Sequence, residues 1–127
     1  MTSVGIDLVR VSRVAESLAS FGERFLKRVF TDGEVAYARQ APSLMAERLA
    51  ARFAAKEAAF KALGLDVASW RQIEVTRAPS GRCALSLHGA ARDAAAEAGV
   101  VELSVSLSHE GDYATAVVLA MRNQEAA

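Results

Sequence analysis

A stretch without proline or glycine runs from Ser43 to Leu63, between Pro42 and Gly64. Alanine is frequent in it, and large apolar side chains recur at helical spacing, at Leu49, Phe53, Phe60 and Leu63. This pattern predicts one long central helix, which ends at Gly64 because glycine readily adopts the left-handed conformation that terminates helices. The rest of the fold is therefore expected to pack around this helix.

The segments on either side of this helix show different periodicities. We predict strands over residues 4–11, 71–78, 82–89, 101–109 and 113–121, and further helices over 13–22, 33–39 and 90–99. Ser12 is expected to cap the first helix, and Thr31 or Asp32 the second, with Glu34 completing a capping box. This order predicts an α+β fold in which a mostly antiparallel sheet packs against the long central helix.

Composition limits the classes of protein to consider. A chain of 127 residues with 52% hydrophobic residues is expected to form one domain, residues 1–127. Fifteen basic and fifteen acidic side chains balance, which disfavours nucleic acid as a partner. Cys83 is the only cysteine, and no signal peptide or apolar run of about 20 residues is present, so we expect no membrane association and place the chain in the cytoplasm.

Asp7 is unusual because aspartate is disfavoured inside strands, and its neighbours are apolar on both faces of the strand. Its carboxylate is therefore expected to be shielded from water and to need a partner. A structural ion pair would satisfy it, and so would a hard cation. Both interpretations remain open for this residue alone.

A basic row follows on the central helix. Arg48, Arg52 and Lys56 are spaced four residues apart, an arrangement of like charges that an anionic ligand would relieve. A solvated helix face is the alternative interpretation. Glu57 can form a helical ion pair with Lys61, or it can meet Asp7 if the helix packs on the first strand. Two acids beside several cations suit a Mg²⁺-phosphate complex.

The strand near the C-terminus carries a third candidate. Ser104, Ser106 and Ser108 alternate with apolar residues, and His109 lies near the strand end. His109 can be an ordinary half-buried hydrogen-bonding residue or a phosphate contact. Zinc is disfavoured because the two histidines and the lone cysteine lack ligand spacing.

Three blocks, GIDLVRVSRV, RLAARFAAKEAAFKALG and VSLSHEGDYATAVVL, resemble the holo-[acyl-carrier-protein] synthase family in the family's own order. The resemblance covers nearly the whole chain and implies a 4'-phosphopantetheinyl transferase fold. It departs from the family pattern at Gln72, Cys83 and the short loop after Gly64. Val9 replaces an acid of the larger relatives, so the chain is similar to the small class, which forms homotrimers with active sites between subunits.

The resemblance also implies a reaction. The 4'-phosphopantetheine group of coenzyme A would pass to a serine of apo-acyl carrier protein, in support of fatty acid or polyketide synthesis. Asp7 and Glu57 would bind Mg²⁺ or Mn²⁺. Glu57, directly or through a metal-bound water, would accept the serine proton, and Lys61 would bind phosphate or orient the hydroxyl. Further coenzyme A contacts are expected at Arg48, Arg52, Lys56 and His109.

The family docks acidic carrier proteins on a basic helix. Residues 10–28 hold five basic and two acidic side chains, an excess of three positive charges. We therefore expect docking by Arg13, Arg24 and Arg28, with Phe25 as an apolar anchor. An ordinary solvated helix is the alternative interpretation. Two alternatives compete with the transferase: a non-catalytic module that binds coenzyme A or a carrier protein, and a Mg²⁺-dependent phosphohydrolase.

Overall fold

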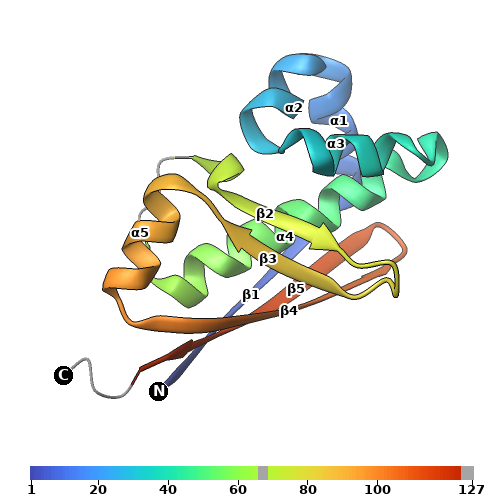
Figure 1. The fold of residues 1–127 in the computed structure, drawn as a ribbon. Helices are drawn as coiled ribbons and strands as arrows, with labels where there is room; N and C mark the ends of the chain where they lie inside the picture. The colour runs from blue at the N-terminus through green and yellow to red at the C-terminus, as the bar shows by residue number, and fades with distance from the viewer. Residues whose placement is uncertain (66–68, 124–127) are drawn as a thin grey trace.

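The computed structural model describes residues 1–65 and 69–123, and in these ranges the long helix α4 (Met45–Leu63) is the element around which the others are arranged (Figure 1). It packs on an antiparallel sheet of three strands in the order β1-β5-β4, with β1 Thr2–Arg10, β4 Val100–Glu110 and β5 Tyr113–Arg122. The predicted α+β architecture, an antiparallel sheet on a long helix, is confirmed.

Of the remaining elements, a β-hairpin runs alongside α4, while the last helix and the first three helices lie toward opposite ends of it (Figure 1). The hairpin is a second antiparallel sheet that pairs β2 (Ile73–Arg77) with β3 (Cys83–Leu87), and the last helix, α5 (Gly89–Glu97), connects β3 to β4. Three short helices gather at the other end: α1 (Val11–Phe21), α2 (Glu23–Val29) and α3 (Asp32–Arg39). Two single 3₁₀ turns, Pro42–Leu44 and Trp70–Gln72, precede α4 and β2.

Small residues bring β1 against α4. The buried face of α4 is rich in alanine, and Gly5 of β1 lies so close that a Cβ atom there would overlap the carbonyl oxygen of Ala58. The Ser3 hydroxyl donates a 2.6 Å hydrogen bond to the carbonyl of Ala62. Because alternate strand residues share a face, Asp7 also points toward α4. The backbone contact thus fixes where Asp7 meets the helix.

The other face of β1 is apolar and uncovered. Val4, Ile6 and Leu8 are 60%, 63% and 64% exposed. The expected shielding of the Asp7 carboxylate therefore comes from the α4 side alone, where its side chain is 20% exposed. The three side chains face solvent because α4 covers only one side of the β1-β5-β4 sheet.

Local predictions succeed where their partners are near in sequence. The capping box of Thr31 and Glu34 is present, and Gly64 ends α4 in the left-handed conformation. Ser12 does not cap α1, since the cap position is Arg10. Residues 23–29, not predicted as helix, form α2 after Gly22 breaks the chain direction at φ 52°.

Two further points concern the limits of the described ranges. The short loop expected after Gly64 includes residues 66–68, which lie outside them. Within the described ranges, no helix combines the length and apolar character needed to cross a membrane.

Candidate active site

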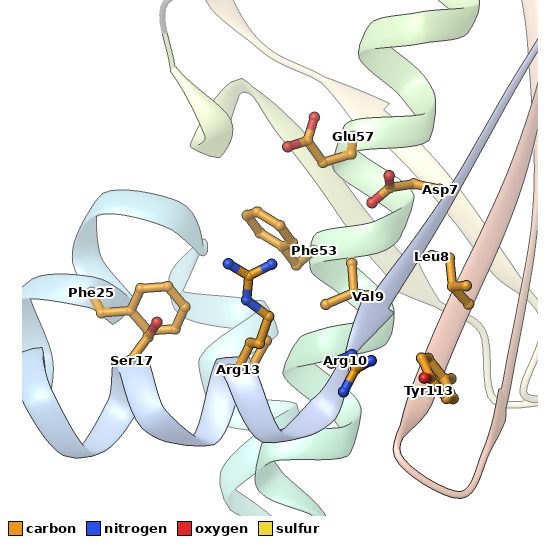
Figure 2. A pocket seen from close by; sticks show the side chains of 11 residues that line it. Asp7, Leu8, Val9, Arg10, Arg13, Ser17, Phe25, Phe53, Glu57 and Tyr113 are labelled. Carbon is orange, nitrogen blue, oxygen red and sulfur yellow. The ribbon is translucent and has the colours of Figure 1, made fainter.

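Asp7 and Glu57 line one cavity of about 570 Å³, between the end of β1, the middle of α4 and the start of α1. Figure 2 shows the two carboxylates close to each other, with the Arg13 guanidinium pointing toward the same space from α1. The predicted convergence of the two acids is confirmed. It follows from the close packing of β1 on α4 at Gly5.

Lys61 accompanies Asp7 in this cavity region. Its ammonium donates to the carbonyl oxygen of Ile6 at 2.9 Å and lies 3.4 Å from Asp7 Oδ1. The ion pair formed by Lys61 is thus with Asp7 of β1, not with Glu57 one turn earlier. The Asp7 side chain is half-buried at 20% exposure, while Lys61 is 56% exposed. The Lys61 ammonium is therefore accessible to a ligand while it remains beside Asp7.

Glu57 is held in an environment that disfavours its negative charge. Partial burial and the nearby Asp7 carboxylate raise the pKa of Glu57, while Lys61 acts in the opposite direction. Two carboxylates that repel each other across one cavity form a site that a divalent cation would stabilise. Asp7 and Glu57 thus offer a pair of hard oxygen donors to such a cation.

The donor set suits Mg²⁺ or Mn²⁺. Among the described residues, no group of three or more His, Cys, Asp or Glu side chains is arranged to hold a metal ion. Mg²⁺ commonly takes one or two protein carboxylates and completes its shell with water and phosphate oxygens. Asp7 and Glu57 could hold such an ion together with a phosphate ligand, and their role as metal ligands stays a prediction.

The cavity has walls that sequence reasoning missed. Phe53 precedes Glu57 by one helical turn on α4, and its ring lies 5.1 Å from that of Trp70. Tyr113 contributes from the start of β5, with the Arg10 guanidinium 5.5 Å from its ring centroid. Phe53 lies four residues before Glu57, and this spacing could have indicated that the two side chains share one face of the helix. Nothing in the sequence near β1 indicates Tyr113.

The expectation that Lys56 contacts an anionic ligand is corrected. Its side chain is fully buried, and its ammonium lies 2.8 Å from Glu34 Oε1 of α3. The same ammonium donates to the carbonyl of Trp70 at 3.1 Å and to that of Ile73. Burial lowers the pKa of Lys56, and Glu34 counteracts this effect. Lys56 is thus a structural cation rather than a ligand contact.

Arg52 lines a different cavity, on the α3 side of α4, and Arg48 stands one turn before it beside Tyr37. Their guanidinium carbons stand 4.1 and 4.3 Å from the centre of the Tyr37 ring, and that of Arg77 stands 5.3 Å from it. Arg52 is 5% exposed, and its Nε finds no hydrogen-bond partner within the described part of the chain. Of the basic row on the central helix, Arg48 and Arg52 therefore remain suited to an anion. They lie away from Asp7 and Glu57.

His109 lies at the end of β4, where its Nδ1 is 3.0 Å from Glu47 Oε1 at the start of α4. It is more than half exposed. Because β5 separates β4 from β1 in the sheet, His109 lies across the sheet from Asp7. The structure does not bring these two residues together within one chain.

The expected docking residues are distributed over two helices. Arg13 is on α1, whereas Arg24 and Arg28 are one turn apart on α2, and all three are exposed. Phe25 is half-buried, packs edge-on against Phe30 with ring centroids 5.6 Å apart, and lines the cavity beside Arg13. The basic surface therefore borders the cavity that holds the two acids.

Known proteins resemble the chain over nearly its whole length. A model of the 4'-phosphopantetheinyl transferase superfamily matches residues 3–118. A holo-[acyl-carrier-protein] synthase from Moorella thermoacetica is 50% identical over 123 residues, which cover 94% of this chain and 93% of that protein. The structure of an ACPS-CoA complex from Chronobacterium ammoniagenes matches with a TM-score of 0.88 at 37% identity, covering 98% of this chain and 99% of that one.

A second complex extends the likeness. The Helicobacter pylori holo-[acyl-carrier-protein] synthase in complex with coenzyme A has a TM-score of 0.81 and 27% identity, covering 93% of this chain and 99% of that one. The superfamily match over residues 3–118 includes the segments that carry Asp7 and Glu57.

Proposed function

The chain belongs to the 4'-phosphopantetheinyl transferase superfamily, and we propose that it is a holo-[acyl-carrier-protein] synthase. It transfers the 4'-phosphopantetheine group of coenzyme A to a serine of apo-acyl carrier protein, in support of fatty acid or polyketide synthesis. The observation that carries the proposal is the convergence of Asp7 and Glu57 in one cavity, with Lys61 paired to Asp7. The cytoplasm, expected from the sequence, remains our proposed compartment, and cell fractionation would test it.

The residues of the cavity suggest how transfer proceeds. When bound, the metal would supply positive charge to the pyrophosphate of coenzyme A. Glu57, directly or through a water molecule, accepts the proton of the carrier serine as the serine oxygen bonds to the β-phosphorus. The bond from that phosphorus to the bridging oxygen breaks, and adenosine 3',5'-bisphosphate leaves. Lys61, exposed beside Asp7, binds the transferring phosphoryl group or orients the serine.

Coenzyme A contacts are proposed at two further places. Arg48 and Arg52 offer positive charge beside Tyr37, and His109 offers a ring nitrogen at the end of β4. Both places lie away from Asp7 and Glu57 in one chain. A single coenzyme A molecule contacts the two acids as well as His109 and the arginines most simply if His109 and the arginines come from a neighbouring subunit. This separation supports the proposal of a homotrimer with active sites between subunits.

The carrier protein is proposed to dock on α1 and α2. Arg13, Arg24 and Arg28 present positive charge to an acidic partner, and Phe25 lies between this surface and the cavity. A serine carried by the docked partner would then enter beside Arg13. Reversing the charge at Arg13 and Arg24 should weaken carrier binding, and unchanged affinity at low salt would contradict this docking surface.

Mass spectrometry of the carrier tests the proposed reaction. Incubation with apo-carrier protein, coenzyme A and Mg²⁺ should add about 340 Da to the carrier, as phosphoryl transfer requires. Asp7→Ala and Glu57→Ala should each abolish the addition because they remove the acids of the cavity. Asp93→Ala, which removes a 74% exposed acid of α5, is the matched control and should retain activity.

The outcomes separate the competing functions. A non-catalytic module would bind coenzyme A or carrier without any mass change. A phosphohydrolase would consume coenzyme A and leave the carrier unmodified. Full activity in Asp7→Ala or Glu57→Ala would remove that residue from the proposed metal site.

A further inference from the structure

Helix α1 begins without a cap of its own. The cap residue is Arg10, whose side chain makes no capping hydrogen bond to the described residues, and the first turn contains no acid. Arg10 and Arg13 instead place positive charge at the helix end that already carries the positive pole of the dipole. The unpaired N–H groups and the like charges both disfavour this helix start.

Asp112 supplies what the helix lacks, from the β4–β5 turn a hundred residues away. The Ser12 N–H donates to Asp112 Oδ1 at 2.9 Å, and the Ser12 hydroxyl donates to Oδ2 at 2.6 Å. The Val11 N–H donates to the backbone carbonyl of Asp112 at 2.8 Å. Both carboxylate oxygens and the carbonyl are therefore engaged with the first turn of α1, and the negative charge lies at the positive pole.

This contact joins two walls of the candidate active site. Arg10 and Arg13 line the cavity from the start of α1, and Tyr113, the residue after Asp112, lines it from β5. Arg10 lies over the Tyr113 ring. Figure 2 shows Arg10 near the turn that leads into Tyr113. A shift of the helix start would therefore move Arg13 relative to Asp7 and Glu57.

We propose that Asp112 is a positioning residue for carrier recognition, because it fixes the first turn of α1 and thereby orients Arg13 at the mouth of the cavity. The inference rests on the proposed function, in which α1 receives the carrier protein. Asp112 touches neither of the two acids, so its effect passes through α1.

Charge alone predicts the opposite effect, which makes the inference testable. Asp112 is an acid at the border of a surface proposed to bind an acidic carrier. If it acted only through its field, its removal would strengthen carrier binding. If it positions α1, its removal weakens carrier binding although an unfavourable charge has gone.

The experiment measures steady-state kinetics of transfer with Asp112→Ala, at a temperature where circular dichroism shows the protein folded. The KM for apo-carrier should rise roughly fivefold, the factor expected from loss of a helix cap, while the KM for coenzyme A stays within about twofold. Ser12→Ala should show part of the rise. In the double variant, the KM for apo-carrier should exceed that of Asp112→Ala by less than the factor seen for Ser12→Ala alone. Both changes remove the same hydrogen bond, between the Ser12 hydroxyl and Asp112.

Two further variants serve as controls. Glu110→Gln removes a neighbouring exposed acid from the end of β4 and should leave the carrier KM unchanged or lower it. Arg13→Glu should raise the carrier KM whether or not Asp112 matters. A rise with Arg13→Glu but none with Asp112→Ala would overturn the inference and leave the proposed docking surface intact.

Other outcomes also decide. Equal rises in both KM values for Asp112→Ala would indicate a general loss of structure and overturn the positioning role. No effect of Arg13→Glu would overturn docking on α1 and the inference with it. An absence of transfer by the unmodified protein would remove the proposed function as well.

Discussion

At Gly5 the backbone of β1 lies directly against the backbone of α4. An added Cβ would overlap the carbonyl oxygen of Ala58 and lie 2.7 Å from the amide nitrogen of Ala62. Both atoms belong to the helix backbone, so no side chain can rotate away to make room. Asp7 is the next residue on the same face of β1, which makes this contact the determinant of the distance between Asp7 and Glu57.

Gly5→Ala is therefore expected to damage the fold and the site together. Overpacking costs about 1–3 kcal/mol, and rigid backbone partners place this case at the upper end. Urea unfolding should show the loss of stability, and carrier modification should fall because Asp7 moves away from Glu57.

Gly64→Ala is a control that separates strain from displacement. Gly64 has φ +64°, and no atom of the described residues lies within 4 Å of a Cβ added there. Left-handed strain should cost roughly 1–2 kcal/mol without moving Asp7. The role assigned to Gly5 would be contradicted if Gly5→Ala lost no more stability than Gly64→Ala and kept full activity.

At the scale of elements, the buried pair of Glu34 and Lys56 ties α3 to α4. Glu34 Oε1 also accepts from the Thr31 N–H at 2.9 Å, and its Oε2 accepts from the Val75 N–H of β2 at 2.8 Å. Lys56 donates to the Trp70 carbonyl in the turn before β2. One ion pair thus joins three elements, and both side chains are fully buried.

Lys56→Met should destabilise the protein by about 3–5 kcal/mol, because it leaves the Glu34 carboxylate buried without its cation. The double variant Glu34→Gln/Lys56→Met should be more stable than Lys56→Met, since no buried charge remains. Urea unfolding measures both. Arg39→Met, which breaks the exposed ion pair with Glu23, should cost less than about 1 kcal/mol. A similar small cost in Lys56→Met would contradict the structural role of the pair.

The elements show which features a sequence can predict. The long helix, its end at Gly64 and the capping box of Thr31 depend on residues within a few positions, and all three are as predicted. The convergence of Asp7 and Glu57 depended on the central helix packing on the first strand, and the family motifs added only their expected role as metal ligands. Helix α2 was missed because residues 23–29 are basic and aromatic and stand directly after another helix.

Other features depend on residues distant in the chain. Lys56 looked like part of a solvated or ligand-binding row because its partner Glu34 precedes it by 22 residues on another helix. No local pattern marks Asp112 as a partner of α1, because Ser12 is a hundred positions away. No periodicity or spacing rule connects such pairs, and only the packing of β5 beside β1 brings the second pair together.

At the scale of the whole molecule, one face of the β1-β5-β4 sheet remains without a covering layer. Rows of paired residues cross it, such as Val4, Leu119 and Ser104, with Val4 and Leu119 60% and 42% exposed. The next row pairs Ile6 with Val117 and Ser106. Apolar side chains over β1 and β5, beside small serines on β4, form a surface typical of an interface between subunits.

Leu119→Glu tests whether this face joins copies of the chain. Leu119 is on the central strand β5, so a charge there would be buried in any assembly through this face. Sedimentation should show the unmodified protein near three times 13.5 kDa and the variant at 13.5 kDa. Because the side chain is exposed in one chain, the variant should stay folded, and it should lose transfer activity if the site needs a neighbour's His109. Ala96→Glu on α5 adds the same charge elsewhere and should change neither property. A fully active protein of 13.5 kDa would overturn both the assembly and the shared site.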